Sequence, residues 1–416
     1  MNTNCLTKRA GVVLSGLVFL GLAVPSANAS PSRDYYKVGV VTSLSGQMVR
    51  GGNVTRRGYD LWAETVNKQG GIEVAGHKYK VRLIYADGQS NPQSTADAAQ
   101  RMITRDHVDF ILGPYASGTT LGAAPITERY KVPMITGSAE SPTIWTHHFK
   151  YTFGTIPSVD HTAGKIVETV VNQNPSAKTI AIFGINDPFS KSTAEAYRTE
   201  AKKLGLKILS YDVVPTDADP QPLVIKARSE KPDILAISGE ISNNINAINS
   251  MKSINYSPNA LLMHYGVNTN SFLKATGKWS NYVIGATLWS PKTPYKGQLF
   301  GTAQDYYKTA QIRYGSAPDY TEAASSAAGE AFAAALKEAK LTPPLTTAKR
   351  EKLMKALEKI NIMTFYGPIA FDTSGKWYHD NTKLNPLVIQ MINGKAVIVG
   401  PGKLGNQKVV YPRPKP

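Results

Sequence analysis

Short apolar runs rich in β-branched residues alternate along the chain with longer stretches in which apolar residues recur every three to four positions. The short runs are typical of buried strands, and the longer stretches are typical of helices with one apolar face. In the first part of the chain the expected strands are 36–42, 79–85, 108–112 and 133–136, and the expected helices are 53–68, 94–104 and 117–130. This order predicts an α/β fold with a parallel sheet covered by helices on both faces.

The same alternation then starts again, which predicts a second sheet and therefore a second lobe. The expected strands of this second part are 179–183, 207–214, 233–237 and 260–263, and its expected helices are 192–204, 221–229 and 241–254. No low-complexity linker separates the two parts. We therefore expect several crossings of the chain between the lobes rather than a single connection.

In the last hundred residues the regular alternation of strands and helices ends. Two expected helices, at 321–339 and 349–360, suit a chain that returns to the first lobe. An extended stretch is expected at 369–371, followed by a hairpin with strands 387–392 and 397–400 around the turn Asn393-Gly394. Residues 411–416 alternate proline with charge and predict a frayed tail.

The N-terminus has the pattern of a cleaved signal peptide. Lys8 and Arg9 precede an apolar run at 11–24, and Ala27-Asn28-Ala29 supplies small residues before a cleavage site. We expect residues 1–29 to be removed and the mature chain to begin at Ser30. A retained membrane anchor is the alternative, but the run is short of the roughly 20 residues that a spanning helix needs.

Composition narrows the function further. Residues 30–416 are enough for two domains of ordinary size, and the lone cysteine, Cys5, lies in the expected leader, so the mature chain has no thiol chemistry. Removal of Lys8 and Arg9 lowers the formal charge from +17 to +15 (17 − 2). The basic residues are scattered without long runs, which indicates a solvated basic surface rather than a nucleic-acid site. We expect a soluble monomer that binds no nucleic acid.

Polar loops follow several of the expected strands. Open α/β sheets bind ligands at the carboxyl ends of their strands, often where a helix begins. Loop 113–120 places three hydroxyls and free backbone N–H groups at a helix start, an arrangement that favours a carboxylate. Helix capping without any ligand explains the same residues. Further strand-end loops with polar or aromatic residues are 136–142, 186–189, 238–240 and 264–266.

Signatures of catalysis are missing. The sequence contains no dinucleotide-binding glycine pattern after a strand, no phosphate-binding loop, no nucleophile elbow and no zinc-protease motif. His147 and His148 are adjacent, so they point apart in a strand and chelate a metal poorly; solvent-exposed histidines explain them better. We expect no enzyme, no cofactor and no metal.

From Tyr36 to Gly400 the chain resembles the periplasmic solute-binding proteins of branched-chain amino-acid ABC importers. The matching stretches are 38–46, 113–118, 133–142 and 366–368. The resemblance implies a type I periplasmic binding protein fold, with two Rossmann-like lobes, a ligand cleft and three interlobe crossings near Pro157, Leu288 and Gly367. The implied lobes are 30–157 plus 289–366 and 158–288 plus 367–416.

The resemblance also implies a set of ligand-binding residues. Ser117 is expected to hold a ligand carboxylate with backbone groups of Ser138 and Glu140. The other implied or neighbouring positions are Gln47, Tyr115, Ser158, Phe189, Glu240 and Tyr265.

The sequence departs from the family pattern at the ligand's amine. Amino-acid binders of the family hold the ammonium with acids at the positions that match Ser158 and Tyr265, and this chain has acids at Glu140 and Glu240 instead. A relocated ammonium site and a ligand without an α-amino group, such as an aromatic or keto acid stacking on Phe189 and Tyr265, are both open. The implied function is the periplasmic binding component of an importer, with a membrane permease as partner. A ligand-sensing receptor of the same fold and an α/β enzyme are the alternatives.

Overall fold

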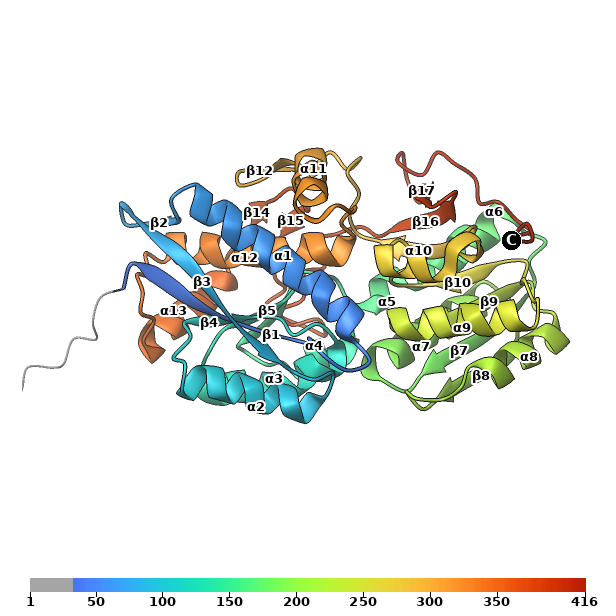
Figure 1. Ribbon diagram of the computed structural model, residues 1–416, viewed down its shortest axis with the longest axis horizontal. Helices are drawn as coiled ribbons and strands as arrows, with labels where there is room; N and C mark the ends of the chain where they lie inside the picture. The colour runs from blue at the N-terminus through green and yellow to red at the C-terminus, as the bar shows by residue number, and fades with distance from the viewer. Residues whose placement is uncertain (1–32) are drawn as a thin grey trace, which may run out of the picture. The chain divides into compact units, whose positions relative to one another are not determined.

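The structure is a computed structural model that describes residues 33–416, which form one compact unit (Figure 1). The expected leader at 1–29, with Cys5, lies outside the described residues. Among residues 33–416 no helix has the length and apolar character needed to cross a membrane.

The first lobe is built on a six-stranded sheet with the order β2-β3-β1-β4-β5-β6. Its strands are β1 (Tyr35–Thr42), β2 (Ile72–Val74), β3 (His77–Asp87), β4 (Phe110–Leu112), β5 (Met134–Thr136) and β6 (Thr152–Gly154). All neighbours pair in parallel except β2, which forms a hairpin with β3. The expected parallel sheet of the first lobe is therefore present.

Alternate residues of these strands belong to two different apolar clusters, one on each face of the sheet. Val40 and Leu112 belong to the core cluster that includes residues of α1 (Val49–Lys68) and α12 (Tyr320–Glu338). Their neighbours Val41 and Ile111 belong to a second cluster with α2 (Pro92–Thr104) and α3 (Ser117–Tyr130). Because successive strand residues point to opposite faces, this division covers both faces of the sheet with helices, as Figure 1 shows.

The second lobe is built on a seven-stranded sheet with the order β17-β16-β11-β10-β9-β7-β8. Its strands are β7 (Thr179–Ile185), β8 (Lys207–Val214), β9 (Ile234–Ser238), β10 (Leu261–Met263), β11 (Val283–Thr287), β16 (Leu387–Ile392) and β17 (Lys395–Gly400). The helices that follow these strands or lie near them are α6 (Gly164–Gln173), α7 (Pro188–Lys203), α8 (Gln221–Glu230), α9 (Ile241–Ser253) and α10 (Asn270–Thr276). The hairpin β16–β17 adds the antiparallel edge expected around Asn393-Gly394.

Several elements escaped sequence analysis, mostly because they are short. They are β2, α4 (Pro142–Thr146), β6, α5 (Val159–Thr162), α6, α10, the 3₁₀ helix Gly277–Ser280, β11, β12 (Lys296–Gly297), β13 (Gly301–Thr302) and α11 (Ala303–Tyr314). Helix α13 (Thr347–Leu357) ends earlier than the expected 360, and β15 (Pro368–Ile369), paired with β14 (Ile362–Met363), replaces the expected stretch 369–371. These differences leave the order of the layers unchanged.

The C-terminal segment is held in place at Arg413, contrary to the prediction of a frayed tail, although Pro412, Pro414 and Lys415 are exposed. The Arg413 side chain is buried. Its Nη2 donates to the Trp279 carbonyl at 2.6 Å and its Nε to the Asn281 carbonyl at 3.0 Å. A segment rich in proline and charged residues is ordered at this point because the Arg413 guanidinium donates to two backbone carbonyls.

The chain passes between the sheets after β6, after β11 and before β16. Asp380 forms a parallel bridge with Gly154 of β6, so the chain is still beside the first sheet at that residue. It joins the second sheet only at Leu387. The third passage thus lies later than the expected position near Gly367, because a backbone bridge that sequence patterns do not show holds residue 380 to β6.

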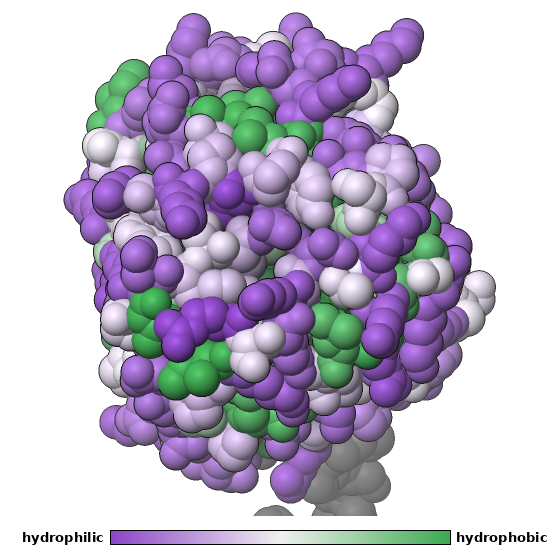
Figure 2. All heavy atoms as spheres, turned by 90° about the vertical axis from the view of Figure 1, so that its right-hand side faces the viewer, coloured by the Kyte–Doolittle hydropathy of each residue, from purple (hydrophilic) through white to green (hydrophobic). Residues whose placement is uncertain are grey.

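The surface is mainly polar. The face drawn in Figure 2 is largely hydrophilic, with small separate apolar patches. Among the described residues the exposed large apolar side chains are Ile225, Ile312 and Met363, which come from separate parts of the chain.

Candidate ligand-binding site

A small pocket lies where strand-end loops of both sheets meet. Its lining residues follow β4 and β5 of the first sheet and β7, β9 and β10 of the second. They are Tyr115, Ala116, Ser117, Ser138, Glu140, Phe189, Glu240 and Tyr265. The carboxyl ends of parallel strands are where open α/β sheets bind ligands, so the pocket lies where the fold favours a site.

Seven of the nine residues expected from the sequence line this one pocket, and two do not. Gln47 lines a neighbouring crevice instead, which it shares with Glu240. Ser158 is fully buried beside the first passage between the sheets, where its backbone N–H donates to Asp380 Oδ2 at 2.9 Å. The geometry therefore groups Tyr115, Ser117, Ser138, Glu140, Phe189, Glu240 and Tyr265, and leaves Gln47 and Ser158 outside the lining.

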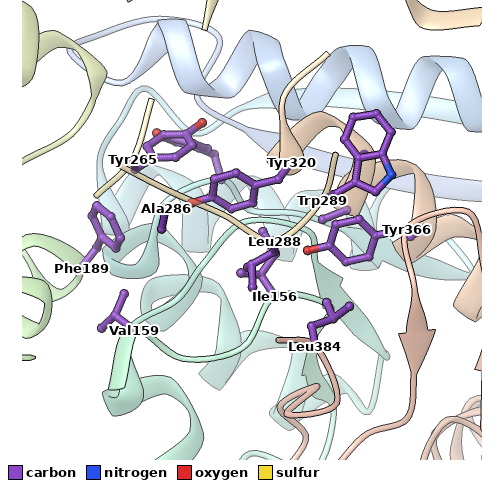
Figure 3. Packing of buried hydrophobic residues seen from close by; sticks show 14 of the residues in the cluster. Ile156, Val159, Phe189, Tyr265, Ala286, Leu288, Trp289, Tyr320, Tyr366 and Leu384 are labelled. Atoms are coloured by element: carbon purple, nitrogen blue, oxygen red, sulfur yellow. The ribbon is translucent and has the colours of Figure 1, made fainter. Parts of the chain in front are cut away.

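Aromatic rings enclose much of the pocket. Tyr265 has its ring centroid 6.3 Å from those of Tyr115 and Phe189, and 5.7 Å from that of Tyr320. Figure 3 shows Phe189, Tyr265 and Tyr320 converging on the same region. The contacts of Tyr265 with Phe189 and Tyr320 are edge-to-face, a favourable arrangement that holds the rings in fixed positions, whereas Tyr115 is tilted against Tyr265.

The N-terminal caps of α7 and α12 fix the positions of Phe189 and Tyr320. Asp187 precedes α7, and its carboxylate accepts the Ser190 N–H at 2.9 Å, which fixes the turn that carries Phe189. Asp319 caps α12 in the same way by accepting the Glu322 N–H at 2.8 Å, which places Tyr320 in the first turn.

A hydrogen bond joins the two sheets across the pocket. The Tyr115 hydroxyl, from the first lobe, donates to Glu240 Oε2, from the loop before α9. Burial, with the negative charge of Asp187 adding to it, raises the pKa of Glu240 to about 8. Glu240 is therefore mainly protonated at neutral pH, which limits the cost of burying it without a cation.

The pocket is narrow in this arrangement. The free space between its walls is about 10 Å³, room for about one water molecule. A Cβ atom at Gly51 of α1 would lie 1.9 Å from a ring carbon of Tyr115, so a side chain there would collide with the ring. A ligand larger than water must therefore move Tyr115 away from Glu240 or separate the lobes.

Two wider crevices adjoin this region. One has a volume of 400 Å³ and contains Gln47, Arg50, Asp187 and Glu240 in its lining. The other, of 540 Å³, contains Arg50, Arg57 and Lys274. Glu240 lines both the narrow pocket and the first crevice, so the two spaces are adjacent at this residue.

The start of α3 forms an end of the pocket suited to an anion. Ser117 Oγ accepts the backbone N–H groups of Glu140 at 3.2 Å and Ser141 at 3.0 Å. Two accepted bonds leave the Ser117 hydroxyl proton to donate. The N-cap residue, Ala116, has no side chain that could satisfy the first N–H groups of the helix. These donors favour negative charge, helped by the helix dipole.

The backbone groups expected to assist Ser117 already have partners. The Glu140 N–H is bound to Ser117 Oγ, and the Ser138 N–H donates to Thr136 Oγ1 at 3.3 Å. The free N–H groups at the start of α3 are better placed for a carboxylate in this geometry.

Glu140 occupies another end of the pocket. Its Oε1 accepts the Tyr320 hydroxyl at 2.8 Å, and its Oε2 lies 3.7 Å from His264 Nε2. Burial lowers the pKa of His264 to about 3, and the same Nε2 lies 2.9 Å from Thr162 Oγ1. His264 is therefore neutral, and its contact with Glu140 is not an ion pair.

Two further residues near this end of the pocket were not predicted from the sequence. Tyr320 begins a late helix and reaches Glu140, 180 residues earlier in the chain. Asp380 is fully buried and accepts the Ser158 N–H. Neither follows an expected strand, so no local pattern in the sequence marked them. Across residues 33–416 no three His, Cys, Asp or Glu side chains are grouped to hold a metal ion.

Fold and site together define a two-lobed protein with a ligand pocket between its sheets. A family model described as periplasmic binding protein matches residues 36–395. The chain therefore belongs to the periplasmic binding protein family. The fold class expected from the sequence and the resemblance to this family are confirmed.

Similar proteins make the resemblance more specific. The Leu/Ile/Val-binding protein homolog 3 of Brucella melitensis is 26% identical over 203 residues, 49% of this chain and 54% of that protein. The chain thus spans about half the length of the curated relatives it matches. The matched family and these relatives are binding proteins, in line with the expectation of a protein that is not an enzyme.

Solved structures share the fold over most of the chain. The branched-chain amino acid transporter substrate-binding protein LivJ of Streptococcus pneumoniae, in complex with isoleucine, has a TM-score of 0.75 at 19% identity, covering 88% of this chain and 100% of that one. An ABC-transporter solute-binding protein of Rhodopseudomonas palustris, in complex with 3,4-dihydroxybenzoic acid, has a TM-score of 0.73 at 19% identity, covering 88% and 95%. At this identity the likeness establishes the fold alone.

Proposed function

We propose that the protein is the extracytoplasmic solute-binding component of an ABC importer and captures a small carboxylate by closure of its two lobes. The observation that carries the proposal is the pocket formed by strand-end residues of both sheets, joined across the lobes by Tyr115 and Glu240. Membership of the periplasmic binding protein family supports it. The ligand is an amino acid or an aromatic or keto acid.

The ligand carboxylate binds at the start of α3. The Ser117 hydroxyl donates to it, and the first N–H groups of the helix assist. No lysine or arginine lines the pocket, so the carboxylate is held by neutral donors and the helix dipole. Phe189 and Tyr265 pack against the rest of the ligand.

An α-amino group, where the ligand has one, binds Glu240. Tyr265 and Glu240 line the same pocket, so a tyrosine hydroxyl and an acid are both available to the amine. The ammonium displaces the Tyr115 hydroxyl and lets Glu240 ionise, because an adjacent cation stabilises the carboxylate. A ligand without an amine leaves Glu240 protonated and bound to Tyr115.

Closure of the lobes provides the signal that the importer reads. One lobe contains 33–157 and the chain from 289 to about Asn381, and the other contains 158–288 and the hairpin β16–β17. Figure 3 shows Ile156, Leu288 and Leu384, one residue from each passage between the sheets, in the same apolar region. Ligand bound to both lobes favours the closed arrangement by its differential affinity.

The partner is a membrane permease, and the protein acts in the periplasm as a monomer after removal of residues 1–29. A ligand-sensing receptor is the second candidate for the same fold. The two differ in partner, so co-purification with a permease and its ATPase supports import, and capture by a receptor supports sensing.

A thermal-shift screen of residues 30–416 tests the proposal, after unfolding and refolding to remove bound ligand. The panel holds amino acids, aromatic and keto acids, amides and polyamines. A ligand at 100 times its dissociation constant stabilises the fold by about 2.7 kcal/mol. A shift with at least one carboxylate is expected, and no shift with any carboxylate contradicts the proposal. Turnover of a bound compound would instead favour an enzyme.

A further inference from the structure

The pocket contains two acidic side chains and no basic one. Glu140 and Glu240 both line it, and none of its other lining residues is lysine, arginine or histidine. The exposed fraction is 2% for Glu140 and 6% for Glu240. Buried carboxylates require a cation or several hydrogen-bond donors, and the lining provides only part of this.

Glu140 has an oxygen atom without a partner. Its Oε1 accepts the Tyr320 hydroxyl, but no hydrogen-bond partner among the described residues reaches its buried Oε2. Glu240, in contrast, has its Oε2 bound to the Tyr115 hydroxyl. An unsatisfied oxygen in the wall of a ligand pocket points to a donor supplied by the ligand.

The groups around Glu140 add negative charge rather than positive. Its pKa lies well above the usual range because of burial first, with the charges of Asp380, Glu240 and Asp319 adding to the effect. Tyr320 opposes the shift by its hydrogen bond. His264, the nearest basic group, remains neutral. None of these neighbouring groups carries a positive charge that would compensate an ionised Glu140.

The neighbours of Glu240 differ from those of Glu140. Tyr115 and Tyr265 line the pocket beside Glu240, Asp187 adds negative charge, and Glu240 also lines the 400 Å³ crevice. Glu140 faces His264 and Tyr320 instead. The two acids therefore have different neighbours within the same pocket.

We propose, building on the function above, that Glu140 selects a ligand with a second cationic amine, so that the favoured ligands are diamino acids. The carboxylate binds at α3, the α-ammonium binds Glu240, and the distal ammonium binds Oε2 of Glu140. The two ammonium groups compensate both acids when these ionise. A ligand with a single amine leaves Glu140 buried without a cation.

Matched pairs of ligands test the selection without any change to the protein. L-Ornithine and L-norvaline share a carbon chain, as do L-lysine and L-norleucine, and the first of each pair carries the additional amine. Calorimetry on the refolded protein is expected to show at least one diamino acid binding tenfold or more tighter than its partner. Equal or weaker binding of both diamino acids overturns the inference.

The variant Glu140→Gln tests the assignment to this residue. The amide side chain of the variant can still accept the Tyr320 hydroxyl but presents an N–H₂ group in place of Oε2, which repels a cation. The advantage of the diamino acid is expected to fall to less than threefold, with norvaline or norleucine affinity changed by less than threefold. A preserved tenfold advantage overturns the assignment. Glu338→Gln, at an exposed position of α12, is the matched control and should leave both affinities unchanged.

Proton release provides a readout that does not depend on the variant folding. Ammonium binding ionises both acids, so diamino-acid binding should release protons, seen as a dependence of the binding enthalpy on the buffer's ionisation enthalpy. Absence of release overturns the ionic role of Glu140 and Glu240. Tight binding of norvaline, norleucine or aromatic acids alone refutes the inference but supports the proposed function, whereas no binding by any carboxylate refutes both.

Discussion

Replacement of Glu240 by glutamine isolates the energetic effect of burying an acid in the pocket. Glutamine has almost the same shape and still offers an oxygen to the Tyr115 hydroxyl, but it does not titrate. We expect Glu240→Gln to make the ligand-free protein more stable at neutral pH. At pH 5 the two proteins should differ little.

The magnitude follows from the raised pKa. Burial and Asp187 move the pKa of Glu240 from 4.5 to about 8. In the folded protein the group keeps its proton up to about pH 8, whereas the unfolded chain loses it near 4.5. The unfolded state thus gains stability as pH rises through this window, and folding stability is lost. At pH 7 the interval of about 2.5 pH units corresponds to about 3 kcal/mol as an upper limit.

Motion of the lobes reduces this figure, because an opened pocket lets the carboxylate reach water. We therefore expect the Glu240→Gln variant to gain about 1–3 kcal/mol over the parent protein at pH 7 relative to pH 5. The other buried acids with raised pKa values, such as Asp319 at about 6, are common to both proteins and cancel in the difference.

Urea unfolding at several pH values between 5 and 8 measures the effect. The parent protein should lose free energy of unfolding more steeply with pH than the variant, and the difference between the slopes should approach one proton. The exposed Glu338→Gln should follow the parent within about 0.5 kcal/mol throughout. Identical slopes for Glu240→Gln and the parent would falsify the claim that Glu240 is buried without a compensating cation.

Three further predictions test other parts of the site. Ser117→Ala should weaken binding of a carboxylate ligand by about 1–3 kcal/mol in calorimetry, the effect of losing one hydrogen bond to a charge; unchanged affinity with the fold intact contradicts its role. Gly51→Ala should lower the melting temperature, because its Cβ would meet the Tyr115 ring at 1.9 Å. Gly118→Ala, whose Cβ would have its nearest contact at 3.5 Å, should leave the melting temperature unchanged. Burial lowers the pKa of His264 to about 3, so its imidazole NMR signals should not shift between pH 5 and 8. The unfolded chain takes up this proton near pH 6.5, so the folding stability should decrease on account of His264 only below about that pH. A titration of His264 near pH 6 would show that the ring is exposed to water.

Local patterns were sufficient for the layers of the fold. The long helices α1, α3 and α12 and the strands β1, β3 and β8 lie close to their expected positions, because their length and periodicity determine them. Strands β6 and β11 were missed because glycine and threonine interrupt their short apolar runs, and a run of three to five residues has no periodicity of its own.

The strand-end loops were recognised individually because residues that follow a parallel strand gather at one edge of the sheet. Their grouping into one pocket, with Ser117 and Glu140 from the first lobe and Phe189, Glu240 and Tyr265 from the second, depends on how the two sheets face each other. Sequence spacing does not encode that arrangement directly.

The sequence by itself determined the element types, the two-sheet α/β class, the family resemblance and the absence of lysine and arginine from the loops that form the pocket. The tertiary structure decided which oxygen atoms have partners. Tyr320 reaches Glu140 from 180 residues away, and the bridge between Gly154 and Asp380 sets the third passage. Burial then shifts the pKa values of Glu140, Glu240 and His264, because desolvation depends on the complete packing around a group and on no single stretch of the chain.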